Sequence, residues 1–458
     1  MKRIALLVGV LFIGFTCELF DRHPAWAFSL YPENHLMPRL TNEFVSSTPW
    51  YKTIDCGWGG HVKLRGSTSW VDGDSLYQPV GTGRYYDGNA EGRFKTNLFF
   101  GKWGYFEAHY EVVFSGGDTR RKSKSLAHRY PTLFGSDFPL VRTVEDNRRL
   151  MDLTKIIDDD ERYVLYHRLD RLSLTLQPKW GVVRIGRQAI TWGNGLLFNP
   201  MDLFNPFSPT DIERDYKIGD DLVSVQLPLK GSGDVQFLYV PRRNPDTRNV
   251  KWDHSSLAVK LHLKMGTTEV DMVAARHYED AVLGLGSTGY VKDAAWRLDL
   301  IGTILSGSSD TDTFVSLVAN IDYSWVWKGK NWYGLLEFYF NGLSHNLYAE
   351  GLTDPDISER LARGELFTLG RTYLGSHIMS ELHPLFNVYL TVITNLADPS
   401  AVLQPRAIWD TVENVQVTFG GNIILGERGT EFGGFKLPGT NLSLKQPDSA
   451  FLWVSYFF

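Results

Sequence analysis

The chain has 458 residues, of which 47 are basic and 52 acidic, so its formal net charge is −5. That balance argues against a nucleic-acid partner, since binding to phosphates needs clustered positive charge. Of the two cysteines, only Cys56 lies beyond the first 27 residues, which we expect to be removed, so the sequence predicts no disulfide framework, no cysteine zinc site and no C-x-x-C-H attachment of haem. It therefore predicts no metal and no cofactor.

The first 27 residues have the pattern of a cleaved signal peptide. Lys2 and Arg3 precede an apolar run over 4–15, and Ala25-Trp26-Ala27 is a small-x-small site of the kind that signal peptidase cuts. A lipoprotein signal ending at Cys17 is the alternative, but a bulky Phe precedes that cysteine where small residues are needed. We expect export and a mature chain that begins near residue 28.

Beyond residue 27 there is no apolar run of 18 residues, so the chain cannot cross a membrane as helices. Segments that alternate between apolar and polar residues follow one another instead, as half-buried strands do. A soluble, secreted β-sandwich or solenoid would also show this alternation. We predict eighteen strands, over 60–69, 93–101, 103–115, 162–177, 180–189, 219–229, 233–241, 254–264, 267–277, 280–288, 292–304, 313–326, 331–343, 365–379, 384–394, 400–410, 413–424 and 449–458.

The connections between these strands alternate in length. Short turns such as Gly101-Lys102 and Lys264-Met265-Gly266 separate the long connections 70–92, 116–161, 190–218, 242–253, 344–364 and 425–448. A barrel with both chain ends on the periplasmic side needs an even strand number, with short turns on one side and longer loops on the other. The sequence therefore predicts an all-β fold, a transmembrane antiparallel β-barrel of about 18 strands over 54–458, preceded by an N-terminal periplasmic segment over 28–53.

Where alternation is clean, the two faces of the predicted strands differ in character. The outward set is apolar and includes Val62, Leu64, Phe94, Val112, Leu257, Leu336 and Phe419. The inward set carries eleven basic and six acidic residues: Lys63, Arg65, Arg93, Lys95, Arg171, Arg184, Lys260, Lys264, Arg297, Arg371 and Arg406 against Glu107, Glu111, Asp271, Asp299, Asp322 and Glu337. His109 also points inward, and pore lining is our interpretation for all of these residues. Charges that merely pair across strands are the alternative.

The connection 190–218 and the residues before it contain the most unusual motif of the chain. Gly186-Arg187-Gln188 is followed by Trp192-Gly193-Asn194-Gly195 and by Asn199-Pro200-Met201-Asp202. This motif resembles a signature, roughly G-R-Q…W-G…N-P-x-D, of proteobacterial outer-membrane barrel proteins that are mostly uncharacterised. The barrel itself resembles general porins in strand number and chain ends, and in porins the loop after the fifth strand bends into the lumen.

The same connection is too apolar for a solvated surface loop, so we expect it to fold inward after the fifth strand. In the functional interpretation it forms a pore constriction, in which loop charges face basic wall residues such as Arg184 or Arg187. The alternative is a packed loop that braces the wall, with the aspartates capping turns. The loop charges in question are Asp202, Asp211, Glu213, Arg214 and Asp215.

The connection 116–161 has a basic cluster near its start and an acidic cluster near its end. The basic residues lie over 120–129 and the acidic ones over 158–161. Basic clusters can bind the phosphates of lipopolysaccharide and acidic ones can bind divalent cations. A solvated loop that pairs its own charges is the interpretation that we favour.

The last strand ends on an aromatic residue. Ala450, Leu452, Val454, Tyr456 and Phe458 fall on one face, because strand side chains alternate. An apolar row that ends in aromatics suits a face that meets lipid. The strand resembles the terminal strand of bacterial outer-membrane β-barrels, and the resemblance implies that Phe458 and Tyr456 form a signal read by the barrel-assembly machinery.

Taken together, these features predict a passive outer-membrane channel, not an enzyme, for small hydrophilic solutes. Its partners would be outer-membrane lipid, lipopolysaccharide and the assembly machinery. The inward basic surplus predicts a weak anion preference. One alternative is a structural sheath around a periplasmic partner, such as a multihaem cytochrome in an electron conduit. Another is an outer-membrane enzyme, although no G-x-S-x-G motif occurs near a His and an Asp.

Overall fold

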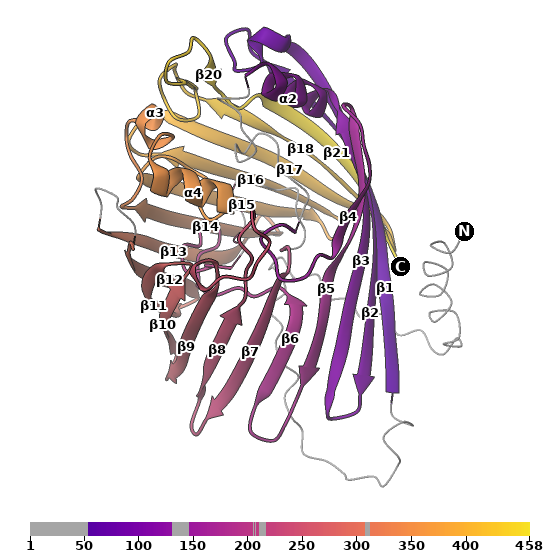
Figure 1. Ribbon diagram of the computed structural model, residues 1–458, viewed down its shortest axis with the longest axis vertical. Coiled ribbons are helices and arrows are strands. Elements are labelled where there is room, and N and C mark those ends of the chain that lie inside the picture. The colour runs from indigo at the N-terminus through magenta and orange to yellow at the C-terminus, as the bar shows by residue number, and fades with distance from the viewer. Residues whose placement is uncertain (1–53, 131–145, 205, 207, 210–216, 307–311) are drawn as a thin grey trace.

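A closed antiparallel β-barrel forms the body of the protein (Figure 1). The computed structural model describes residues 54–458, apart from 131–145, 205, 207, 210–216 and 307–311. Nineteen strands form one sheet. One of them, β4, only fills part of the wall beside β5, so eighteen strands close the barrel and the predicted fold class is confirmed. The predicted signal peptide and the segment 28–53 lie outside the described residues.

The elements follow in chain order with few helices between the strands. The strands are β1 (Ile54–Val71), β2 (Gly83–Phe100), β3 (Gly104–Gly117), β4 (Thr154–Asp159), β5 (Tyr163–Leu176), β6 (Val182–Gln188), β7 (Asp220–Leu229), β8 (Gly233–Val240), β9 (Ser256–Met265), β10 (Thr268–His277), β11 (Asp280–Val291), β12 (Ala294–Ile304), β13 (Thr313–Trp327), β14 (Lys330–Asn341), β15 (Thr372–His383), β16 (Phe386–Asn395), β17 (Ser400–Val412), β18 (Val415–Leu425), β19 (Phe435–Lys436), β20 (Ser443–Leu444) and β21 (Asp448–Phe457). The helices are η3 (Gln78–Val80), α2 (Asp118–Arg129), η4 (Trp252–His254), α3 (Tyr348–Gly351) and α4 (Pro355–Arg363). Among the described residues, no helix is both long and apolar enough to span a membrane.

The barrel closes where β21 pairs with β1. The pairs run antiparallel from His61 opposite Phe457 to Trp70 opposite Asp448. Beyond the last pair, the backbone N–H of Phe458 donates to the carbonyl of Gly60 at 3.1 Å, and the N–H of Gly60 donates to the carbonyl of Phe458 at 2.9 Å. The terminal residue is therefore the last rung of the closure.

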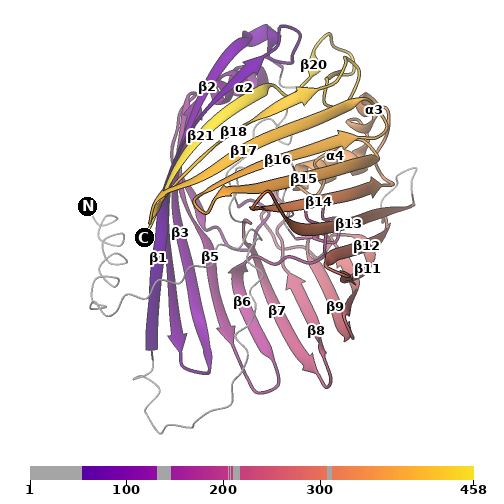
Figure 2. The same cartoon turned by 180° about the vertical axis from the view of Figure 1, so that it is seen from behind.

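Short turns and long connections lie at opposite ends of the barrel, as the sequence predicts. In Figure 1 the turns between β2 and β3 and between β7 and β8 point to the bottom, whereas α2 and α3 lie near the top. Figure 2 shows the tilted strands β13 to β18 and β21 on the other side. We call the two ends the turn end and the loop end.

Several predicted strand boundaries are wrong. β1 and β2 pair over their full length, from Ile54 opposite Phe100 to Val71 opposite Gly83, so they reach well past 60–69 and 93–101. Their outer parts carry many small and polar residues, which hides the alternation. The strand expected over 365–379 runs from Thr372 to His383, because the residues before it belong to the connection after α4.

The outward face of the wall is apolar. Val62, Leu64 and Leu336 are about half exposed, as are Phe419 and Leu452. The inward residues next to them, such as Lys63 and Trp453, are buried. The predicted outward set therefore faces away from the lumen, and a lipid environment suits it.

β4 completes the wall where β6 is too short. β3 occupies one edge of β5; on the other edge, β6 pairs with Leu172–Leu176 and β4 with Val164–Arg168. β6 ends after seven residues because the chain turns into the lumen there. A strand from the preceding connection thus supplies backbone partners that would otherwise be missing at the loop end.

Four connections at the loop end pack into one structure, here called the cap. It consists of residues 72–82, 118–130, 342–371 and 426–447, with α2, α3, α4 and the β19–β20 hairpin. One apolar cluster joins Leu76, Leu126 and Leu442, and a second joins Ile357, Leu366 and Phe435. Leu352 and Leu444 pack against both clusters, so the four connections share a continuous core.

The basic and acidic clusters of the connection 116–161 pair with each other. The guanidinium of Arg120 and the ammonium of Lys124 both contact the carboxylate of Asp159. Lys122 and Arg129 donate to the carbonyls of Val80 and Pro79. The interpretation of a loop that pairs its own charges is confirmed.

We expect the substitution Phe458→Asp to lower the amount of folded barrel sharply. It keeps the backbone rung to Gly60 but removes the ring, which lies 6.3 Å from the ring of Trp58. It also places a charge on the lipid-facing row. Folded protein is measured by the shift in gel mobility between unheated and heated samples. Val412→Asp, at the exposed apolar last residue of β17 at the turn end, is the matched control. A normal amount of folded Phe458→Asp protein would contradict the role of this residue.

Candidate constriction of the lumen

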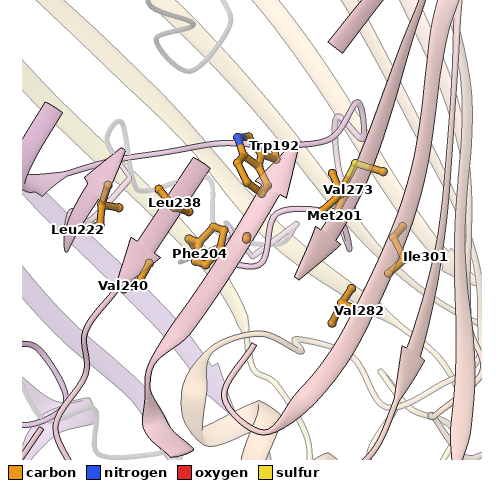
Figure 3. Packing of buried hydrophobic residues seen from close by; sticks show 10 residues of the cluster. Trp192, Met201, Phe204, Leu222, Leu238, Val240, Val273, Val282 and Ile301 are labelled. Carbon is orange, nitrogen blue, oxygen red and sulfur yellow. The ribbon is translucent and has the colours of Figure 1, made fainter. Parts of the chain in front are cut away.

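After β6 the chain leaves the wall and enters the barrel as an apolar loop. We call residues 189–204 the inward loop. Trp192, Met201 and Phe204 from this loop are buried. Figure 3 shows them packed against wall side chains, which are Leu222, Leu238, Val240, Val273, Val282 and Ile301. The loop after the fifth barrel strand therefore folds inward, as predicted.

The tip of the inward loop is an aromatic stack. The ring of Phe198 lies 4.5 Å from that of Tyr339 at an interplanar angle of 13°, and 5.4 Å from that of Tyr373. Ile393 and Val402 complete this cluster from the next strands of the wall. The loop thus crosses the inner face from β7 as far as β17.

Two wall carboxylates bind the backbone of the inward loop. Glu337 of β14 accepts hydrogen bonds from the N–H groups of Leu196, Leu197 and Phe198, at 2.7, 3.0 and 2.6 Å. Asp299 of β12 accepts from the backbone and side-chain amides of Asn194, at 2.6 and 2.7 Å. Both carboxylates are fully buried. Successive N–H groups aimed at one point form an anion-binding concavity, which a wall residue fills here.

Glycines let the loop come this close to the wall. A side chain at Gly375 would place its first carbon 2.4 Å from Leu197. Within the loop, Gly193 has φ of +89°, a conformation that other residues rarely adopt. The glycines of the motif therefore serve the path of the backbone.

Asp202 does not face Arg184 or Arg187, so that prediction is wrong. Its carboxylate receives the ammonium of Lys217 at 2.5 and 2.6 Å, and both side chains are buried. Burial raises the pKa of the Asp202 carboxyl to about 6, although Lys217 opposes the shift. Lys217 also donates to the carbonyl of Ile190, so the pair joins the two ends of the loop.

Arg187 is a buried anchor and does not reach the pore. Its guanidinium donates to Asp221 of β7 at 2.8 Å and to Asp146 at 2.9 Å. Burial alone would raise the pKa of Asp146, but Arg149 and Arg187 together lower it to about 2. This cluster fastens β6, β7 and the chain before β4 at the point where the inward loop leaves the wall.

The other predicted constriction residues do not form the predicted pairs in the described part of the chain. Arg184 points inward but donates to the hydroxyls of Thr175 and Tyr105, at 3.0 and 2.8 Å. Asp211, Glu213, Arg214 and Asp215 lie outside the described residues. Of the predicted constriction charges that the structure describes, none forms a loop-to-wall pair across the lumen.

Most of the predicted pore-lining charges face inward and have partners. Arg93 contacts Glu111 and, at 3.0 Å, Asp170, while the Nε2 atom of His109 lies 3.1 Å from Glu107. Other pairs on the inner face are Arg297 with Asp322, Lys260 with Asp271, Lys63 and Arg65 over the ring of Trp453, and Arg406 over Tyr389. Arg371 lies instead in the cap at an exposed position, where its guanidinium donates to the carbonyl of Ser344. Lys95 is partly exposed on β2. Glu337 also points inward, but the inward loop covers it.

Sequence reasoning missed several inward charges. Glu91 bonds His61 at 3.0 Å, and Asp170 and Arg168 join the Arg93 network. A bulge in the pairing of β3 with β5, between His109 and Tyr110, shifts the alternation at Asp170. Lys217 was missed because it lies in the chain after the motif, and nothing in its spacing points to Asp202.

Among the described residues, no group of three or more His, Cys, Asp or Glu side chains could hold a metal ion.

Comparison with family models and with curated proteins gives no match. Among solved structures, the chain is similar to OccAB2 of Acinetobacter baumannii, with a TM-score of 0.49 and 8% identity over 88% of this chain and 98% of that one. It is also similar to OccAB3 of the same organism, with a TM-score of 0.49 and 10% identity over 88% and 99%. A BenF-like porin from Pseudomonas fluorescens Pf-5 gives a TM-score of 0.46 and 9% identity over 90% and 100%.

We expect Glu337→Gln to loosen the inward loop. An amide has only one oxygen and would turn an N–H group toward backbone donors, so at least one loop N–H loses its partner. A buried donor without a partner costs about 1–3 kcal/mol. The free energy of unfolding in urea should fall by about that amount, and protease cleavage within 190–204 should become faster. Glu381→Gln, which alters an exposed turn-end pair with Asn331, is the control. Equal cleavage rates in the two variants would contradict the anchor.

Proposed function

We propose that the protein is an outer-membrane channel through which small hydrophilic solutes diffuse passively. The observation that carries the proposal is the closed wall itself, apolar outside and charged inside, with an ordered loop laid on its inner face. Outside apolar residues suit lipid, while inward charges suit water. A barrel of roughly 16–18 strands is wide enough to enclose water.

Pore width and wall electrostatics would set which solutes pass. The inward loop covers the apolar inner face from β7 to β17. The charges of β1, β2, β3 and β5 lie outside that covered stretch, and we propose that solutes pass along them. The loop then acts as a constriction by its bulk, and Asp202 and Arg187 hold it in place.

We propose that the anion preference is weak. Most basic residues of the inner face have a carboxylate, an aromatic ring or a carbonyl beside them. A paired charge adds little to the electric field along the pore axis. The surplus of positive charges on the inner face therefore favours anions less than the number of these charges suggests.

Planar-bilayer conductance of the purified barrel tests the channel function. Stable, ohmic single-channel steps in potassium chloride are the expected result. A sheath that holds a periplasmic partner, or a barrel with enzymatic activity, would give little or irregular current. Such a result would overturn the proposal.

Deletion of residues 195–210 should raise single-channel conductance several-fold while the barrel stays folded. The deletion removes the tip of the inward loop, and water replaces it on the wall. Conductance is measured on protein whose gel mobility shows the folded form. The control is a deletion of residues 245–248, which lie in the connection between β8 and β9. An unchanged conductance in the folded deletion mutant would show that the loop only braces the wall.

Reversal potentials in a salt gradient should show a small anion preference, with a permeability ratio of chloride to potassium between about one and three. Arg406→Gln removes one inward positive charge and should move that ratio toward one. Lys328→Gln, at an exposed turn-end position, should leave it unchanged. A clear preference for potassium would contradict the proposed sign of the lumen field.

A further inference from the structure

A cavity lies at the loop end of the lumen, between the inward loop and the cap. It has a volume of about 90 Å³. On one side are Phe198 and Leu203 of the inward loop, and on the other Leu366 and Phe367 of the connection after α4. Residues on the inner faces of β10 to β14 also line it. A space of this size has room for roughly half a dozen water-sized groups, which is the size of a single six-membered ring.

The ionisable side chains that line the cavity all have partners. Arg360 pairs with Asp280, and the Nε2 atom of His277 lies 3.0 Å from the carboxylate of Glu365. Asp202 is held by Lys217. A charged solute would lose its hydration here and find no free counter-charge, so the lining disfavours ions.

The remaining surface combines apolar rings with neutral hydrogen-bonding groups. Phe314 and Phe198 supply rings, while Thr303 and Ser316 supply hydroxyl groups from adjacent strands. Both residues are more than nine-tenths buried, and neither hydroxyl is among the fully enclosed side-chain atoms of the described residues that lack a partner. A hydroxyl that borders the cavity can form a hydrogen bond to a bound solute in place of one to water.

We propose that this cavity binds an uncharged, single-ring solute that carries hydroxyl groups. The ring packs between Phe198, Phe314 and Leu366, and the solute hydroxyls bond to Thr303 and Ser316. Binding sites for small molecules have this composition, mostly apolar with a few placed polar groups. The inference rests on the proposed channel function, because the cavity would then be a binding site for a solute that diffuses through the lumen.

Ligand-observed NMR titration of the folded barrel in detergent tests the proposal without requiring conduction. The probes are glucose and phenol, each set against its charged counterpart, glucuronate and benzoate. At least one uncharged ring should bind with a millimolar dissociation constant, about tenfold or more tighter than its counterpart. Binding of phenol alone or of glucose alone supports the proposal and identifies the ring as aromatic or saccharide. The proposal is overturned if either anion binds more tightly than its uncharged counterpart, or if neither glucose nor phenol binds.

Substitutions of the cavity hydroxyls test whether the probe binds in this cavity. Thr303→Val and Ser316→Ala keep the packing and should each weaken the bound probe by about three- to tenfold, the usual worth of one hydrogen bond. Thr418→Val, at a buried hydroxyl on β18, should change nothing. Equal binding by all three variants overturns the assignment of the cavity.

Conductance of the same preparation distinguishes failure of the cavity proposal from failure of the proposed channel function. A conducting barrel that binds no neutral ring overturns only the cavity proposal, whereas a barrel that binds but does not conduct overturns the channel function.

Discussion

The attachment of the inward loop to Glu337 and Asp299 is the constraint on which the interior of the barrel depends. In the described part of the chain, no cation lies within ion-pair distance of either carboxylate. Their burial is therefore compensated by the N–H groups from which they accept hydrogen bonds, four for Glu337, including the Asn320 amide, and three for Asp299, including the backbone N–H of Gly195. Hydrogen bonds to a charged group contribute about 1.5–3 kcal/mol each, so the loop and the carboxylates stabilise each other. Without the loop, two charges would face the lumen; without the charges, the loop backbone would lack partners.

Alternation, turn chemistry and connection length were enough to predict the barrel, because each is a local property of the chain. The period of two located each of the eighteen strands that close the barrel, and the alternate lengths of the connections agreed with their even number. Local patterns failed where the structure depends on distant partners. β4 has little pattern of its own and forms a strand because the short β6 leaves an edge of β5 unpaired.

The candidate site divides in the same way. The apolar content of the motif and its glycines predicted an inward loop, since both follow from composition. The pairing of Asp202 with Lys217 and of Arg187 with Asp146 could not be predicted, because these contacts join positions 15 and 41 residues apart through the folded lumen. Charge type was visible in the sequence, but which charges meet depends on the bulge at Asp170 and on the path of the loop.

The shared core of the cap limits how freely the loop end can change. Surface connections between strands usually tolerate insertions and sequence drift, because few contacts depend on them. Here Leu352 and Leu444 tie two apolar clusters together, so a longer or altered connection in one place disturbs the packing of the others. Insertions for display or labelling would be tolerated at exposed tips such as Pro438-Gly439, which contribute nothing to that core. The end of the barrel that carries the long connections is therefore, in this protein, one of the parts whose sequence can change least without disturbing the packing.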